Sequence, residues 1–354
     1  MTTIFPFTKN SIKVNDSLHY YRHSGEFRLE SGEILNDIQI AYQTFGELNS
    51  DKSNVVWICH ALTANADPTQ WWPGLIGYNY LINPEEYFIV CANILGACSG
   101  TTGPRDFDPK TGERYLSKFP NITIRDQVKA HIMLREELGI ERIALGMGGS
   151  TGGQQILEWA IEEPVFDRLF VIATSAQSSP WGKAIRAAQR MAIEADQSFY
   201  SNSANGGKKG MEAARAMALL SYRTPGTFNQ SQKDDNEALD NYKAESYQRY
   251  QGLKLSHRFD AHSYYVLGKA MDTHNVGRGR GGIQKALSSI KAKTLIIGIE
   301  GDILFPIEDQ QTIAEHLPNS TFKIIQSDYG HDGFLIETQK ITEILKPFLS
   351  NESN

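Results

Sequence analysis

The chain has 354 residues, 40% of them hydrophobic and 21% charged, a composition typical of a globular protein with a sizeable core. Its net charge of −6 and pI near 5.9 argue against non-specific binding to nucleic acid or anionic membranes. No apolar run approaches the ~20 residues that span a bilayer. The first residues lack a signal-peptide pattern, and three cysteines (Cys59, Cys91 and Cys98) are too few for a disulfide framework, so we expect a reduced, cytoplasmic protein.

Short apolar runs predict the buried strands of a mostly parallel sheet. The earliest candidate, residues 38–45, alternates apolar and polar residues, as an antiparallel edge strand does. The later runs are more continuously apolar and stand at 55–59, 87–92, 142–145, 169–174, 294–299 and 322–326. Helical patterns separate them, one of which begins with the capping-type sequence 123–126 and ends before Gly139. Strands that alternate with helices predict an α/β fold with an open sheet.

The strand signal disappears between about residues 176 and 290. Patterns at 184–195, 211–222 and 236–251 predict helices there, separated by polar loops at 201–209 and 224–235. Strand character then resumes at Thr294. We therefore expect a core domain of residues 1–175 and 291–354, with a helical cap of residues 176–290 inserted into it. Such a cap would cover the carboxyl edge of the sheet.

A candidate nucleophile stands at the end of the run 142–145. Gly148-Gly149-Ser150-Thr151-Gly152 fits a G-x-S-x-G turn, and the helical pattern 154–163 follows it. Between a strand and a helix, this turn is the nucleophile elbow of an α/β-hydrolase, which holds the serine Oγ above the sheet. The pentapeptide alone is weak, because a glycine-rich chain can match it by chance.

Two partners for Ser150 follow later strands in the chain order that this fold requires, serine, then acid, then histidine. Asp302 comes just after the run 294–299, and His331 just after 322–326. All three residues thus lie at the same carboxyl edge. We expect His331 to accept the serine proton and Asp302 to orient and stabilise the imidazolium.

An oxyanion formed at Ser150 would need two backbone N–H donors. Thr151, directly after the nucleophile, supplies one. The second is expected from the loop after the run 55–59, where we assign it to Leu62. His60, in the same loop, falls in the wrong chain order for the base and is expected to shape the loop. No histidine spacing indicates a metal site, and no lysine follows the glycines at the spacing of a phosphate-binding P-loop.

At this point the chain resembles the homoserine O-acetyltransferase family of α/β-hydrolases over nearly its whole length. Besides the elbow, the matching blocks include His60-Ala61-Leu62-Thr63, Trp71-Trp72 and Gly330-His331-Asp332, and the segments 75–77, 87–96, 100–104, 119–126, 157–160, 189–193, 221–223 and 258–260. The resemblance implies acyl transfer to L-homoserine in methionine biosynthesis by a ping-pong mechanism. Acyl-CoA would be the co-substrate, with no bound cofactor or metal, and the enzyme would be a homodimer built through the cap helices.

The acceptor is a zwitterion, so its pocket needs a cation and an anion. We assign the substrate carboxylate to Arg223, assisted by Tyr222, and the ammonium group to Asp332. The alternative is that Arg223 forms a cap–core salt bridge and that Asp332 caps a helix. Two further arginines, Arg190 and Arg258, are expected to be structural. Arg278 and Arg280 either meet the CoA phosphates or lie in a solvated loop.

Two departures from the family pattern bear on specificity. Thr151 stands where methionine is usual, and Arg105 adds charge in the segment 103–107. We expect acetyl-CoA as donor and homoserine as acceptor, with succinyl-CoA or serine as alternatives. Simple carboxylester hydrolysis is a further alternative, and a binding protein on a hydrolase fold is disfavoured because the whole triad is present.

Overall fold

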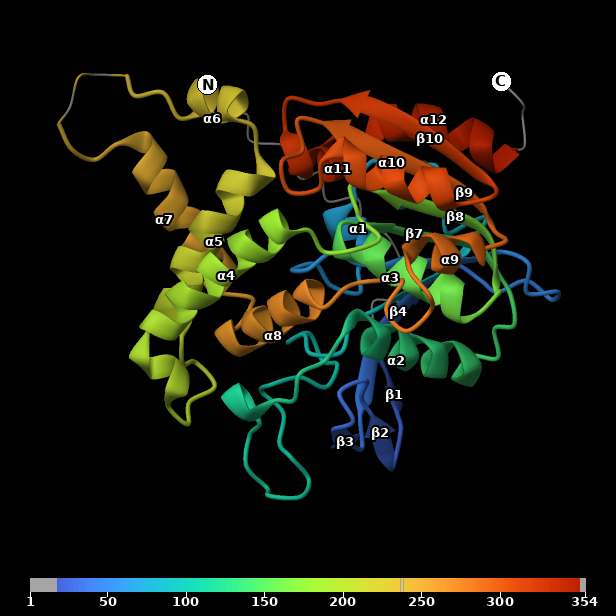
Figure 1. Ribbon diagram of the computed structural model, residues 1–354, viewed down its shortest axis with the longest axis horizontal. Coiled ribbons are helices and arrows are strands. Elements are labelled where there is room, and N and C mark those ends of the chain that lie inside the picture. Colours follow the sequence, from blue (N-terminus) through green and yellow to red (C-terminus); the bar gives the residue numbers. More distant parts are fainter. Residues whose placement is uncertain (1–17, 236, 238, 351–354) are drawn as a thin grey trace.

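The parallel strands of the central sheet all end at the same edge of the sheet. The computed structural model describes residues 18–235, 237 and 239–350. Within them, an eight-stranded sheet has the order β1-β4-β6-β5-β7-β8-β9-β10 (Figure 1). The strands from β5 to β10 run parallel, and β4 runs antiparallel to β1 and β6. The predicted, mostly parallel α/β architecture is confirmed. The strands are β1 (His19–Arg22), β4 (Gln39–Phe45), β5 (Val55–Cys59), β6 (Phe88–Ala92), β7 (Ile143–Gly149), β8 (Phe166–Ile172), β9 (Lys293–Glu300) and β10 (Ser320–Gln326), besides a separate hairpin of β2 (Glu26–Arg28) and β3 (Ile34–Asn36).

The prediction of an edge position for residues 38–45 is wrong. They form β4, but β1 pairs with its outer side, with His19 opposite Tyr42 and Arg22 opposite Gln39. β1 is a four-residue strand with two tyrosines and two polar ends, too short to give a periodic signal. The edge position is therefore held by β1.

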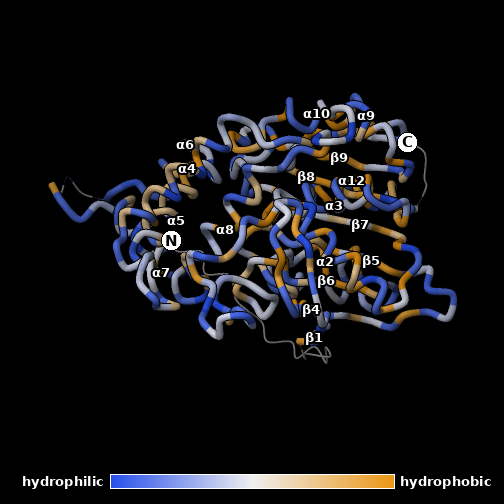
Figure 2. Tube along the Cα trace, turned by 60° about the horizontal axis from the view of Figure 1, so that its bottom comes forward, coloured by the Kyte–Doolittle hydropathy of each residue, from blue (hydrophilic) through white to orange (hydrophobic). Residues whose placement is uncertain are grey.

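Helices cover both faces of the sheet. Along β5 the side chains alternate, so that Trp57 enters one buried cluster and Ile58 the other. The first cluster includes residues of α2 (Ile124–Glu137), α3 (Thr151–Glu162), α9 (Ile283–Ser288) and α10 (Ile307–His316). The second includes residues of α1 (Pro68–Trp71), α11 (Gly333–Ile336) and α12 (Thr338–Ser350). Figure 2 shows orange, hydrophobic stretches along these strands, as continuous burial requires.

The predicted helix from residue 123 is confirmed, with its cap. The Thr123 side chain accepts a hydrogen bond from the backbone of Asp126, and the Asp126 side chain accepts one from the backbone of Thr123. This reciprocal pair satisfies two backbone donors that the first turn would otherwise leave without partners.

The segment between β8 and β9 is helical and stands to one side of the sheet in Figure 1. It contains α4 (Pro180–Ala195), α5 (Lys208–Tyr222), α6 (Pro225–Ser231), α7 (Lys243–Ser256) and α8 (Ala261–Asp272), which we call the cap helices. The helix predicted for residues 236–251 begins later than expected: residues 236 and 238 lie outside the described part of the chain, the described residues 237 and 239–242 are not helical, and α7 begins at Lys243. Asn241 has a left-handed φ of +62°, which no α-helix can continue through. None of the helices in the described part of the chain is long and apolar enough to cross a membrane.

Candidate active site

The carboxyl ends of three parallel strands, β7, β9 and β10, position the predicted nucleophile, acid and base. Ser150 follows β7 directly, Asp302 follows β9 by two residues, and His331 lies in a 3-10 turn (Gly330–Asp332) after β10. Because β7, β8, β9 and β10 are successive parallel neighbours, their carboxyl ends meet at one edge. The three side chains converge there, and all are buried.

The turn at Ser150 has the strained geometry of a nucleophile elbow. Its φ of +57° and ψ of −127° are rarely adopted by a residue with a side chain, at a cost of about 1–3 kcal/mol. The glycines beside it permit the approach of α3 to the sheet, because a Cβ on Gly152 would lie 2.1 Å from the Cys59 carbonyl oxygen. The backbone is held on both sides: the Ser150 N–H donates to Ile172 at 3.0 Å, and its carbonyl accepts from the Thr174 hydroxyl at 2.7 Å.

The hydrogen bonds of His331 define the direction of proton transfer. Its Nδ1 lies 2.7 Å from Asp302 Oδ2, and its Nε2 lies 3.0 Å from Ser150 Oγ. A carboxylate can only accept, so Nδ1 carries the proton and Nε2 is free to accept one from the serine. The other carboxylate oxygen, Oδ1, accepts from the backbone N–H groups of Leu304 and Phe305 at 2.8 and 2.9 Å. The acid is thereby fixed in place.

The two expected oxyanion donors lie on either side of the elbow. Thr151 is the first residue of α3, so its N–H has no partner within the helix. Leu62 lies in the loop after β5, and its N–H, like that of Thr151, makes no hydrogen bond to the described residues. Free N–H groups beside a buried serine are what a tetrahedral oxyanion requires.

His60 is a structural anchor of that loop. Its Nε2 accepts from the Ile94 N–H at 3.2 Å, so its Nδ1 is the donor to the Ala61 carbonyl at 2.8 Å. Burial lowers the pKa of His60 to about 4, which keeps it neutral. The imidazole therefore ties the loop after β5 to the loop after β6, as the sequence suggested.

Apolar side chains from both sides enclose the triad. Tyr222 and Phe305 place their rings 5.6 and 5.3 Å from the His331 ring. They belong to a cluster that joins Leu62, Ile185, Met271 and Leu304. Burial raises the pKa of Tyr222, so its phenol remains neutral. These contacts leave the nucleophile only 6% exposed.

The residues predicted to bind the acceptor meet each other in the structure. Arg223 Nε lies 3.1 Å from Asp332 Oδ2, and both side chains are partly exposed. The pair joins the end of α5 to the turn that carries His331, which is the cap–core salt bridge considered from the sequence. Arg223 thus has a carboxylate partner already, while Asp332 remains beside the base.

Sequence reasoning missed a second arginine. Arg215 lies on α5, with its guanidinium carbon 5.3 Å from the centre of the Tyr222 ring. It forms no ion pair with the described residues. A detectable signal existed, because residues seven apart share one face of a helix and Arg215 precedes Tyr222 by that spacing. Arg215 is therefore a cation without an ion-pair partner among the described residues, on a ring that in turn contacts His331.

Three of the other arginines weighed from the sequence, Arg190, Arg278 and Arg280, form ion pairs away from the triad. Arg190 and Arg186 both pair with Asp272, at 2.7 and 2.6 Å, and so link α4 to α8. The two arginines in the loop before α9 also have acidic partners. Arg278 pairs with Glu30 at 2.7 Å, and Arg280 pairs with Glu158 at 2.6 Å and with Glu162. Arg278 and Arg280 hold the loop against α3 and the segment around Glu30, so the structure gives no support to their contact with CoA.

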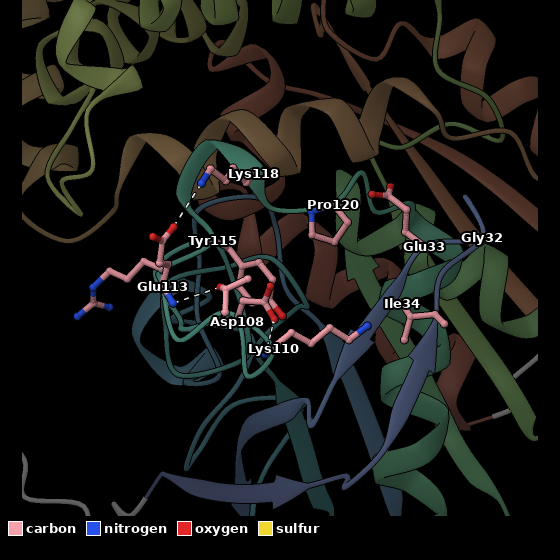
Figure 3. A pocket seen from close by; sticks show the side chains of 11 residues that line it. Gly32, Glu33, Ile34, Asp108, Lys110, Glu113, Tyr115, Lys118 and Pro120 are labelled. Carbon is pink, nitrogen blue, oxygen red and sulfur yellow. Dashed lines mark hydrogen bonds and ion pairs between the residues drawn. The ribbon is translucent and has the colours of Figure 1, made fainter.

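A cavity of about 390 Å³ lies outside this site. Figure 3 shows its lining, which comes from residues 32–34 and 108–120 and includes none of the triad. The Glu113–Lys118 pair at 3.4 Å closes one side of it. In the described part of the chain, no group of histidine, cysteine or acidic side chains could hold a metal ion.

Comparisons with known proteins agree with this geometry. The α/β hydrolase fold family matches residues 54–338. A homoserine O-acetyltransferase from Cyclobacterium marinum is 47% identical over 339 residues, 96% of each chain. The solved structure of homoserine O-acetyltransferase from Bacillus anthracis is 24% identical in sequence, and the match covers 94% of this chain and 97% of that chain. Its TM-score of 0.88 shows that the two proteins share a fold. An acetylester hydrolase from Corynebacterium glutamicum, 26% identical over 94% and 96% of the two chains, has a TM-score of 0.83.

Proposed function

The chain belongs to the homoserine O-acetyltransferase family of α/β-hydrolases, and we propose that it transfers an acetyl group from acetyl-CoA to the side-chain hydroxyl of L-homoserine. This is a step of methionine biosynthesis. Acetyl-CoA is a co-substrate, and the reaction uses no bound cofactor. The observation that carries the proposal is the Ser150–His331–Asp302 array, closed by cap helices that direct an unpaired arginine toward it.

In the first half-reaction, Ser150 Oγ attacks the thioester carbonyl while His331 Nε2 accepts the serine proton. The N–H groups of Leu62 and Thr151 stabilise the oxyanion, and Asp302 stabilises the imidazolium. The tetrahedral intermediate then collapses, His331 returns the proton to the departing sulfur, and CoA leaves. The acetyl group remains as an ester on Ser150.

In the second half-reaction, His331 takes the proton of the homoserine hydroxyl, which attacks the acetyl-serine ester. The same oxyanion donors act again. The intermediate then collapses with cleavage of the bond between Ser150 Oγ and the acyl carbon, His331 returns the proton to Ser150 Oγ, and O-acetylhomoserine leaves. Water is the competing acceptor. We propose that residues 176–290 act as a cap on a core of residues 1–175 and 291–354 and so exclude water. Cap–core contacts support this: the Trp181 indole donates to the Ile303 carbonyl at 2.7 Å, and the Thr224 hydroxyl to that of Asp328 at 2.6 Å.

We assign the acceptor groups anew from the structure. Arg215, which has no carboxylate partner among the described residues, binds the homoserine carboxylate beside Tyr222. Asp332 binds the ammonium group next to the base, and Arg223 holds Asp332 in position. The sequence-based role of Arg223 as carboxylate ligand thereby passes to Arg215.

Thiol release tests the function directly. Purified protein is mixed with acetyl-CoA or succinyl-CoA and with homoserine, serine or no acceptor. We expect the highest rate with acetyl-CoA and homoserine, and an acetyl adduct on Ser150 by mass spectrometry when the acceptor is omitted. Equal rates with and without homoserine would contradict the transferase assignment.

Ester hydrolysis is the second candidate, favoured by the likeness to an acetylester hydrolase at 26% identity. It predicts rapid turnover of p-nitrophenyl acetate that homoserine does not accelerate. The transferase predicts that homoserine accelerates release of p-nitrophenol by drawing off the acyl group.

We further propose a cytoplasmic homodimer formed through the cap helices. Apolar side chains are exposed along α5 and α7, namely Met217, Leu220, Tyr250 and Leu253, with exposed fractions of 40–61%. Exposed apolar stripes on adjacent helices are typical of an interface. Light scattering after size exclusion should give twice the monomer mass, and Leu220→Asp should reduce it to one copy. Leu239→Asp, at a position that is 94% exposed elsewhere, is the matched control.

A further inference from the structure

A second cavity, of about 200 Å³, lies where the cap helices meet the loop after β6. Three stretches of chain form it. The core loop contributes Cys98 and Arg105. The start of α5 contributes Lys208 and Met211, and the segment before it residues 204–206. The end of α7 and the link to α8 contribute residues 256–261. We call it the basic pocket, because cations predominate in its lining.

Three cations line the basic pocket without acidic partners. Arg105, Lys208 and Arg258 form no ion pair with the described residues, in contrast to the saturated Arg278 and Arg280. The one carboxylate in the lining is Asp260, whose Oδ1 accepts from the Ser263 N–H at 2.9 Å and caps α8. The pocket therefore has an excess of two positive charges.

The first turn of α5 lies at the wall of the basic pocket. Its N-cap is Gly207, which has a φ of +76° and no side chain with which to cap the helix. In the first turn, the Gly210 N–H is engaged by the Asp196 carboxylate at 3.1 Å. Lys208 itself begins the helix at the pocket wall. The Asp196 carboxylate is thus already bound at this end of the helix and offsets its partial positive charge, so the charge of the pocket comes from its three cations.

Arg258 connects the basic pocket to the catalytic edge. Its guanidinium donates to the Thr63 carbonyl, in the residue after the oxyanion donor Leu62. Burial lowers the pKa of Arg258, and the nearby charge of Arg215 lowers it further. Arg258 thus links the pocket to the loop that carries Leu62, and it lies close enough to Arg215 to feel its charge.

We propose that the basic pocket binds the phosphate groups of acyl-CoA. This rests on the proposed function for the identity of the donor, but the charge and shape of the pocket are independent of the reaction. In acyl-CoA a long uncharged arm separates the thioester from the phosphates, so the donor needs one site for each end. Arginine and lysine are the side chains that bind phosphate oxygens best. The proposal also gives Arg105, the charged residue that departs from the family pattern, a role in binding phosphate.

Calorimetric titration with CoA tests the proposal without any need for turnover. The variants are Arg105→Gln, Lys208→Gln and the double variant, and pantetheine serves as the ligand without phosphates. Lys209→Gln is the matched control: it removes the same charge from the adjacent residue, which does not line the pocket. Each single variant should raise the Kd for CoA about tenfold, as loss of a charge-assisted hydrogen bond does. The double variant should raise it further, and Kd should increase with ionic strength.

The Kd of the Lys209→Gln variant for CoA should lie within about twofold of the Kd of the original chain, since solvent and salt screen a charge outside the pocket. Pantetheine affinity should be the same in all variants. An unchanged Kd for CoA in the double variant would overturn the proposal, even if homoserine acetylation were intact. Conversely, weakened CoA binding in a protein that fails to acetylate homoserine would leave the pocket assignment standing while refuting the proposed function.

Discussion

The sheet edge and the cap helices hold their functional groups in different ways. At the sheet edge, backbone geometry positions each group: the elbow holds Ser150, and two backbone N–H groups hold Asp302. In the cap helices, contacts with other side chains hold the functional side chains in place. Arg223 is held by Asp332, and Arg215 stands over an aromatic ring with no ion-pair partner among the described residues.

We therefore expect the residues at the sheet edge to carry out acyl transfer and the residues of the cap helices to select the acceptor. A change at the sheet edge should abolish acyl transfer with every acceptor, because no other group can reach the reacting atoms. A change in the cap should leave the acyl-enzyme chemistry intact and alter what collects the acyl group. The following predictions test that separation, beginning with the largest effect.

Replacement of the nucleophile should have the greatest consequence. Ser150→Ala should lower kcat for acetyl transfer by more than about 10⁴-fold, since the acyl intermediate cannot form. Thiol release measures the rate, and mass spectrometry measures the adduct. Far-ultraviolet circular dichroism should match that of the original chain. An unchanged rate in a folded variant would refute the assignment of the nucleophile.

Replacement of the unpaired cap arginine should affect one acceptor only. Arg215→Met should lower kcat/KM for homoserine about 100-fold, through loss of a charged hydrogen bond to the substrate carboxylate. Hydrolysis of p-nitrophenyl acetate in the absence of homoserine should change little, because water has no carboxylate. A parallel loss of both activities would mean that Arg215 supports the triad rather than the acceptor.

The paired arginine should matter less. Arg223→Met should lower kcat/KM for homoserine about fivefold, mainly through KM, because Asp332 remains present but loses the partner that holds it. The matched substitutions at positions 215 and 223 thus rank the two arginines. A larger effect at Arg223 than at Arg215 would restore the sequence-based assignment.

The smallest expected effect is a pH dependence of stability near the triad. Burial, followed by the charges of Asp302 and Glu308, raises the pKa of Asp309 to about 6. A raised pKa favours the folded state at low pH, and this contribution is lost as the pH rises from about 4 to about 6. Asp309→Asn should therefore increase the free energy of unfolding at pH 8 by about 1 kcal/mol, after allowance for solvent screening.

The gain in Asp309→Asn should shrink as the pH falls to 4 and vanish below it, where the aspartate is protonated in the folded and the unfolded state alike. Urea denaturation at the two pH values measures it. Equal stabilisation at both would show that charge is not the cause.

The sequence was sufficient for the catalytic edge because each residue there follows a strand. Strand runs are visible as apolar segments, and the carboxyl ends of parallel strands must share an edge. The order Ser150, Asp302, His331 could therefore be placed before any coordinates. β1 and the late start of α7 escaped this reasoning, the first because it is short and the second because the residues before it adopt a turn.

By itself, the sequence determined the α/β fold and the strand ends at which Ser150, Asp302 and His331 lie, because those depend on local patterns and on strand order. Only the tertiary structure decided which cations are free. It paired Arg223 with Asp332 and Arg278 with Glu30, residues far apart in the chain, and left Arg215 and the basic pocket without acidic partners among the described residues. Ion pairing depends on how helices face one another in space, and that orientation is set by packing across the whole molecule.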